Sequence, residues 1–229
     1  MKILSNQRGF TLAEILVASM ITMLVLGGAV ALTSQVQNGY RRNVEDAAAE
    51  QEGRYALEWI SRLIRSAGNN PYSRPPAPDP PPPAVPTNQT SDCPAPGTPY
   101  SWLVMDPEGD GASIRIQTDS NPPDGNLGGT LGDCTQANED VTVTYDPETR
   151  SITFLDNNLG GAATIRTDAV IEGLNFIYRD GNHEVTANAD NTVYVETQVT
   201  VRTRTIDASS LAPNTRTLTQ EVRIRGRKY

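Results

Sequence analysis

Glu14 is the residue whose type and position most clearly indicate a chemical role. It is the one formal charge in an otherwise apolar run of 23 residues from Phe10 to Leu32. An ionisable side chain in such a run is costly to insert into a bilayer and is usually retained because it meets a partner. A purely structural role of the segment leaves Glu14 unexplained, so we treat it as a candidate for contact with a partner.

The apolar run is long enough to cross the hydrocarbon core of a membrane as a helix. A short leader, residues 1–9, precedes it and carries the cations Lys2 and Arg8 but no apolar stretch of its own. The cleavage site of an ordinary secretory signal follows the apolar stretch, whereas the plausible cut in this chain lies before it. The two cations favour a cytoplasmic N-terminus, although Arg41 and Arg42 beyond the span reduce the charge asymmetry.

The sequence Gly9-Phe10-Thr11-Leu12-Ala13-Glu14 resembles the type IV prepilin signature. The resemblance implies cleavage between Gly9 and Phe10 by a prepilin peptidase and N-methylation of Phe10. It also implies that Glu14 pairs with the N-terminal amine of a neighbouring subunit and sets the register between subunits. The implied partners are membrane lipid before assembly, other pilins and minor pilins, and the assembly machinery of a bacterial inner membrane. The implied final location is a cell-surface pilus.

Helix-forming residues continue beyond the span from Gln37 to Ala67, so we expect one helix over residues 10–67, with Gly68 at its C-cap. Its second half carries apolar residues at helical spacing, which should lie against a sheet. These residues are Ala56, Trp59, Ile60, Leu63, Ile64 and Ala67.

Residues 50–68 resemble the end of the helix in PilW-type minor pilins, with their Gly-Arg-Tyr-Ala and Arg-x-x-Arg-x-Ala-Gly patterns. PilW-type proteins share their overall architecture with the J-type minor pseudopilins of type II secretion. The resemblance therefore implies a minor subunit of a type IV pilus, with a pseudopilin as the alternative.

The rest of the chain predicts a proline-rich loop followed by a β-rich domain. The loop, residues 71–99, holds 12 of the 17 prolines and is expected to be extended, either as a spacer or as a ligand for a partner. Turn signals separate short strand-like runs after it. The expected strands are 100–105, 113–118, 141–145, 151–155, 163–166, 174–178, 192–204 and 218–225.

We therefore expect an α+β fold, in which a long N-terminal helix packs on an antiparallel sheet. The expected divisions are the leader 1–9, the span 10–32, the amphipathic continuation 33–70, the loop 71–99 and the β-rich domain 100–229.

Cys93 and Cys134 are the two cysteines of the chain. In a domain exported from the cytoplasm, such a pair is most simply interpreted as one disulfide. This disulfide would tether the proline-rich loop to the domain.

One acidic run has some character of a calcium site, because calcium takes several oxygen ligands from closely spaced Asp and Asn. Its candidate ligands are Asp119, Asn121 and Asp124. The spacing departs from the usual calcium loop, and the nearest acids downstream are Glu139 and Asp140. A second run, Asp106 to Gly111, is better explained as a hairpin turn. Calcium is the one cofactor that the sequence suggests.

Charge and residue types exclude several function classes. The formal net charge is −8, and loss of the leader cations makes it −10, so non-specific binding of nucleic acid is disfavoured. Arginines near the C-terminus, including Arg223, Arg225 and Arg227, are best explained as the exposed face of an edge strand, with contact to DNA or an acidic subunit as the alternative. The single histidine, His183, has a turn-like context, and we expect no enzyme activity.

Together these patterns predict a minor pilin that primes pilus assembly at or near the tip. The alternatives are a minor pseudopilin of a type II secretion system and a tip-located module that binds DNA or surfaces.

Overall fold

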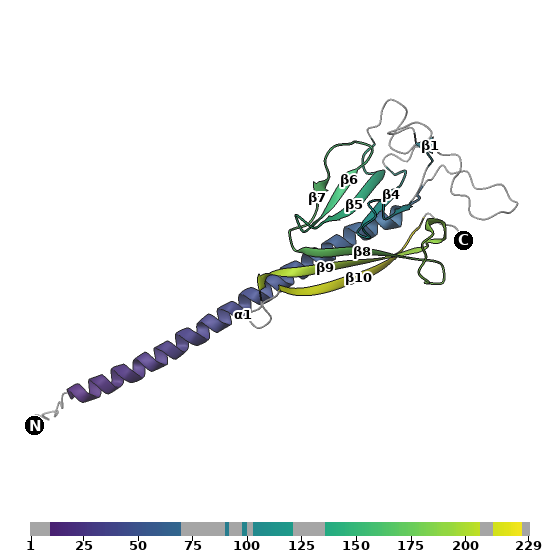
Figure 1. Ribbon diagram of the computed structural model, residues 1–229. Helices are drawn as coiled ribbons and strands as arrows, with labels where there is room; N and C mark the ends of the chain where they lie inside the picture. Colours follow the sequence, from purple (N-terminus) through teal and green to yellow (C-terminus); the bar gives the residue numbers. More distant parts are fainter. Residues whose placement is uncertain are drawn as a thin grey trace, which may run out of the picture. The chain divides into compact units, whose positions relative to one another are not determined.

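A computed structural model describes residues 10–69, 90–91, 98–99, 103–120, 136–206 and 213–225 of the chain (Figure 1). The chain divides into two compact units, Met1–Glu45 and Asp46–Tyr229. Gly9, Cys93, Cys134, Asn121 and Asp124 lie outside the described residues.

Helix α1 spans Leu12–Ser66 and agrees with the expected helix to within two residues at its start and one at its end. Its C-terminal end is defined by Gly68, whose φ of +70° lies in the left-handed region that glycine enters without strain. The backbone N–H of Gly68 donates to the carbonyl of Gln117 at 3.0 Å. The expected C-cap is therefore confirmed, and it joins the helix end to a strand.

The strands form two main antiparallel sheets and a short ribbon. The five-stranded sheet has the order β3-β4-β5-β6-β7, and the three-stranded sheet has the order β10-β9-β8. The five strands are β3 (Leu103–Met105), β4 (Ser113–Gln117), β5 (Asp140–Asp146), β6 (Ser151–Asp156) and β7 (Thr164–Ile165). The three strands are β8 (Ile171–Arg179), β9 (Tyr194–Ile206) and β10 (Pro213–Arg223), with the 3₁₀ turn η1 (Ala189–Asn191) before β9. The ribbon pairs β1 (Thr90–Ser91) with β2 (Thr98–Pro99).

The α+β fold class is confirmed, and every expected strand is present. The single sheet that we expected is instead divided, because β8 pairs with β9 and not with β6 or β7. A strand pattern in sequence shows which residues face the core but does not show which strands pair.

The second half of α1 lies against both main sheets (Figure 1). Ala56, Ile60, Ile64 and Ala67 have no exposed surface, as the apolar stripe predicted. Trp59 packs edge-on against Phe154 of β6, with ring centroids 6.5 Å apart. The sheets add their inward-facing residues to the same core: Ile114, Ile116, Val141, Val143, Ile152, Ile171, Leu174, Phe176, Val195, Val199 and Val201.

Gly53 marks the closest approach of α1 to the three-stranded sheet. A Cβ atom added there would lie 2.7 Å from Cγ1 of Val201 and 2.8 Å from Cδ1 of Leu218, closer than any relaxed contact. Leu218 can change rotamer, but Val201 is β-branched and 2% exposed, so it has little freedom to yield. The helix can therefore reach the sheet only because residue 53 has no side chain.

Gly53→Ala should destabilise the second unit by about 1–3 kcal/mol, because overpacking outweighs the helix propensity that alanine adds. Denaturant unfolding of the full chain in detergent micelles would measure this change. Gly39→Ala is the matched control, since a Cβ at that helical glycine meets no atom within 4 Å. An equal unfolding midpoint for Gly53→Ala and wild type would contradict the packing argument.

Candidate processing and assembly site

Thr11 and Glu14 form a reciprocal pair of hydrogen bonds at the start of α1. The N–H of Thr11 donates to Oε2 of Glu14 at 2.9 Å, and the N–H of Glu14 donates to Oγ1 of Thr11 at 3.3 Å. The Thr11 hydroxyl also donates to Oε2 at 3.0 Å. This arrangement is a capping box, which satisfies backbone N–H groups that the first turn of a helix leaves unpaired.

The capping box corrects one part of the sequence interpretation. Glu14 was unexplained by local structure, yet its carboxylate has a partner within the chain. The signal was present, because Thr-x-x-Glu before an apolar run is the sequence pattern of a capping box. Only Oε2 is used, and Oε1 of Glu14 accepts no hydrogen bond from any residue that the structure describes. The local role therefore leaves one carboxylate oxygen available to a second partner.

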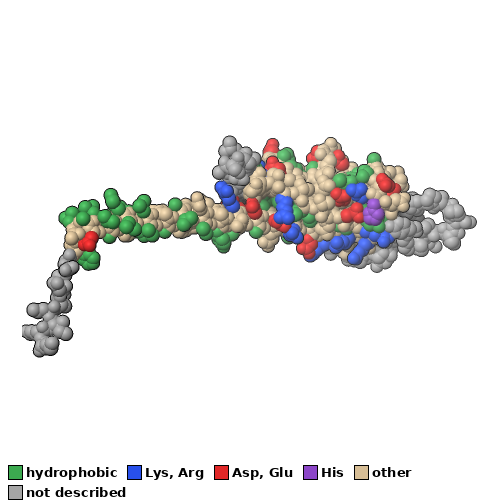
Figure 2. Space-filling model, turned by 90° about the horizontal axis from the view of Figure 1, so that it is seen from below, with side chains coloured by type: hydrophobic (Ala, Val, Ile, Leu, Met, Phe, Trp, Pro, Cys, Tyr) green, Lys and Arg blue, Asp and Glu red, His purple; other side chains and the backbone are tan. Residues whose placement is uncertain are grey.

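The apolar surface of α1 within the first unit is exposed over its whole length (Figure 2). Phe10, the residue expected to begin the mature chain, is 84% exposed. Large side chains on all sides of the helix share this exposure, among them Leu12, Ile15, Leu16, Met20, Ile21, Leu24, Leu26, Val30 and Leu32. A helix that is apolar all round is stable when buried in lipid or among other helices.

Within the part of the chain that the structure describes, α1 is the one helix long and apolar enough to cross a membrane. The helix begins at Leu12 and includes most of residues 10–32, but its 55 residues do not mark where the expected span ends.

Residues 4–30 match the prokaryotic N-terminal methylation motif. No curated protein and no solved structure matches the chain. This motif is typical of type IV prepilin-like proteins, and with the exposed apolar helix it suggests a pilin-like or pseudopilin protein. The motif implies processing by a prepilin peptidase and assembly with other pilins, and the helix fits an inner-membrane anchor followed by incorporation into a filament.

The predicted disulfide and calcium ligands are placed only in part. Both cysteines of the predicted disulfide lie outside the described residues, as do Asn121 and Asp124. Asp119 is buried, with its N–H donating to the carbonyl of Asn69 at 2.9 Å. Glu139 lies beside it, because the N–H of Ser120 donates to its Oε1 at 2.8 Å. The disulfide and the calcium loop stay predictions.

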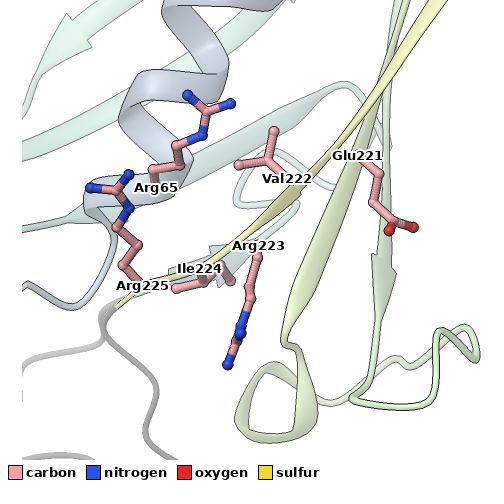
Figure 3. Close-up of a pocket in the computed structure, with 6 residues that line it drawn as sticks. All are labelled: Arg65, Glu221, Val222, Arg223, Ile224 and Arg225. Atoms are coloured by element: carbon pink, nitrogen blue, oxygen red, sulfur yellow. The ribbon is translucent and has the colours of Figure 1, made fainter.

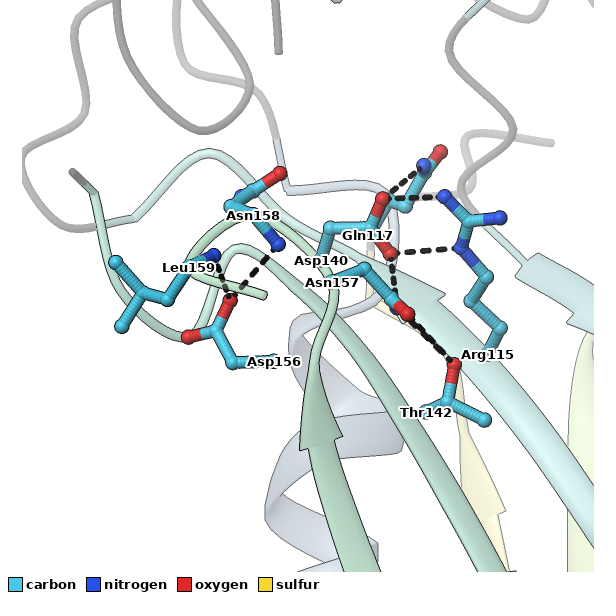
Figure 4. Close-up of polar contacts among 8 residues, drawn as sticks. All are labelled: Arg115, Gln117, Asp140, Thr142, Asp156, Asn157, Asn158 and Leu159. Atoms are coloured by element: carbon cyan, nitrogen blue, oxygen red, sulfur yellow. Dashed lines mark hydrogen bonds and ion pairs between the residues drawn. The ribbon is translucent and has the colours of Figure 1, made fainter. Parts of the chain in front are cut away.

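Asp140, considered as a substitute calcium ligand, is instead part of a protein network (Figure 4). Its carboxylate accepts hydrogen bonds from Nε of Arg115 at 2.7 Å, from Nε2 of Gln117 at 2.8 Å and from Nδ2 of Asn157 at 2.8 Å. The bonds to Asp140 raise the pKa of Arg115, against the opposing effect of its partial burial. This network joins β4 and β5 to the turn after β6. Among the described residues, no group of three His, Cys, Asp or Glu side chains is placed to hold a metal ion.

The second acidic run, Asp106 to Gly111, forms the turn of the β3–β4 hairpin, as expected. Oδ1 of Asp106 accepts hydrogen bonds from the N–H groups of Asp110 and Gly111 and from the Ser113 hydroxyl, at 2.8–3.1 Å. Partial desolvation raises the pKa of Asp106, but these hydrogen bonds together lower it below the ordinary value. The carboxylate of Asp106 therefore stabilises the turn.

The C-terminal arginines lie on or directly after β10, which is the edge strand of its sheet. Arg223 and Arg225 are exposed, so the expected exposed face is confirmed for these two residues, and Arg227 lies outside the described residues. They line a hollow between the last turn of α1 and the end of β10, together with Arg65 (Figure 3). Sequence patterns did not associate Arg65 with this cluster.

His183 lies in the loop between β8 and β9, in agreement with its turn-like sequence context. Its ring stacks on Tyr194, with centroids 4.2 Å apart, and Nδ1 lies 3.0 Å from Oε1 of Glu221. The side chain is 56% exposed. These contacts fix the ring against the sheet at a solvent-exposed position.

Proposed function

We propose that the chain is a PilW-like minor pilin, which a prepilin peptidase cleaves after Gly9 and which joins a type IV pilus at or near its tip. The observation that carries the proposal is a helix that begins within the methylation motif and whose large apolar side chains from Leu12 to Leu32 are exposed. The Gly-Arg-Tyr-Ala sequence of residues 53–56 supports the PilW type, and Gly53 has a structural reason in the contact with β9 and β10. A minor subunit also suits a role in starting assembly.

Glu14 has two functions in this proposal. One carboxylate oxygen closes the capping box with Thr11, and the other pairs with the methylated N-terminal amine of Phe10 in a neighbouring subunit. Two buried opposite charges offset part of each other's desolvation cost, whereas removing one leaves the other unpaired at a cost of about 3–5 kcal/mol. A subunit displaced along the filament would lose this pair, so the pair selects one register.

Intact-mass spectrometry of the protein purified from its host should show a chain that begins at Phe10 and carries one added methyl group. The prepilin signature requires this processing, because the apolar helix must remain attached to the domain after the leader is removed. Gly9→Asp, which places a charge at the cut, should leave the leader attached. A native chain that still begins at Met1 would contradict the proposed processing.

Glu14→Ala should lower the amount of this protein in sheared filaments at least about tenfold more than Thr11→Val does. The first change leaves a buried ammonium unpaired, at about 3 kcal/mol or more. The second removes the capping box, at about 1 kcal/mol, and keeps the carboxylate. Immunoblots of filaments against total membranes would measure incorporation.

Glu14→Gln is the matched control for this comparison, because it can still accept a hydrogen bond from Thr11 but carries no charge. It should behave like Glu14→Ala. Each variant is first checked for cleavage after Gly9, so that a processing defect is not counted as an assembly defect. Equal losses for Glu14→Ala and Thr11→Val would show that Glu14 acts through the capping box alone.

A minor pseudopilin of a type II secretion system is the second candidate, because the methylation motif is common to pilins and pseudopilins. Deletion of the gene distinguishes the two functions. Loss of surface pili with normal secretion of exoproteins supports the pilin, and the reverse result supports the pseudopilin.

A further inference from the structure

The outer edge of β10 presents backbone groups that pair with no other described strand. Among the described strands, β10 pairs with β9 alone and lies at the end of the three-stranded sheet. The N–H of Ile224 donates to the carbonyl of Val193 at 3.0 Å, toward β9. Because backbone groups alternate between the two sides of a strand, the N–H groups of Thr217, Thr219 and Glu221 point to the open side.

The residue after the strand supports this assignment. Arg225 is in phase with Thr219 and Glu221, and its N–H donates away from β9, to the carbonyl of Arg65 at 3.4 Å. The last turn of α1 therefore lies beside the C-terminal end of the open edge. Residues 217–221 of β10 have no comparable contact with another described element along that edge.

Residues 217–220 lack the features that usually prevent edge pairing, which are charged side chains, especially lysine, together with proline, bulges and a very short strand. β10 is 11 residues long, and its register irregularity is confined to residues 213–215. Its two nearest charges already have partners, since Arg216 pairs with Glu50 and Glu221 contacts Arg179 and His183. Between them lie four uncharged residues, Thr217, Leu218, Thr219 and Gln220. The edge therefore has the capacity to accept another strand.

The charged residues beside the open edge of β10 indicate what kind of strand would bind there. Arg65 and Arg225 are exposed and line the hollow at the end of β10, and neither forms an ion pair with another described residue. The carboxylate of Glu221 points away from both guanidinium groups (Figure 3). Two exposed guanidinium groups concentrated here in a chain of net charge −8 favour a partner that carries carboxylates.

We propose that the open edge of β10 binds an extended acidic segment of a neighbouring filament subunit by strand addition. The N–H and C=O groups of Thr217, Thr219 and Glu221 pair with the backbone of the segment, and Arg65 and Arg225 bind its carboxylates. The identity of the partner rests on the proposed pilin function. The strand addition itself rests on the geometry of β10.

Residue-resolved hydrogen exchange of the full chain in detergent micelles tests the strand addition. The probe is a capped peptide of alternating threonine and glutamate, and a threonine–lysine peptide of equal length is its control. The glutamate peptide should slow exchange at Thr217, Thr219 and Glu221 at least about tenfold, because each N–H becomes hydrogen-bonded. The amides of Leu218 and Gln220, which face β9, should not change.

Two sets of variants separate the backbone and charge contributions. Thr219→Pro removes an outward N–H and should abolish peptide protection, whereas Thr219→Val keeps the N–H and should retain it. Retained protection at Leu218 and Gln220 shows that the strand is intact in both. Arg65→Gln combined with Arg225→Gln should weaken binding of the glutamate peptide about fivefold, as expected for two exposed ion pairs.

Three results would overturn the proposal. The first is the absence of protection by the glutamate peptide, and the second is equal protection by the lysine peptide. The third is protection that appears without peptide as protein concentration rises, which would identify a second copy of this chain as the occupant. Equal incorporation of Thr219→Pro and Thr219→Val into filaments would overturn the assignment of the partner to a filament subunit. None of these results alters the processing at Phe10, so the pilin function is tested separately.

Discussion

The structure depends on an apolar helix surface that no described part of the chain buries. From Phe10 to Leu32 the side chains are exposed on every side, and burial of such surface is the main favourable term in folding and association. Lipid or the helices of other subunits must therefore supply the missing contacts. Either environment removes the helix from water, which makes hydrogen bonds at its first turn more important. The capping box of Thr11 and Glu14 meets that requirement for the N–H groups of Thr11 and Glu14.

The same helix has a different chemistry in the second unit. Its burial there is limited to one stripe. Arg54 pairs with Glu50 beside that stripe, and Arg62 pairs with Glu58 on the solvent-exposed side. Such i, i+4 pairs each contribute a few tenths of a kcal/mol, about 0.3–0.5, so packing against the sheets dominates stability. A single helix thus has one half stabilised by its environment and one half stabilised by its own domain. The second half needs Gly53 to approach β9 closely enough.

Much of the fold was predictable because periodicity is a local signal. The helix and all eight strands expected in the β-rich domain were recognised. The predicted ends of the strands were less accurate where the alternation of apolar and polar residues is weak. β10 begins at Pro213, five residues before the expected start at Leu218, because its first half is an exposed edge without apolar alternation. β8 begins at Ile171, before Leu174, and a register shift near Gly173 interrupts its pattern. Strand pairing and the network around Asp140 depend on contacts distant in sequence, so neither was predictable.

The site shows the same division between local and distant signals. The motif at Gly9 to Glu14 was recognised from residue types. The capping box was not predicted, because a lone charge in an apolar segment indicates a distant partner as readily as a local one. The two roles are compatible, since a carboxylate has two oxygens and the capping box uses one. A carboxylate held by Thr11 also has fewer rotamers to lose when it meets an amine, so the pairing costs less conformational entropy. In the proposed assembly, the capping contact therefore lowers the entropic cost of the pairing that sets the register of the filament.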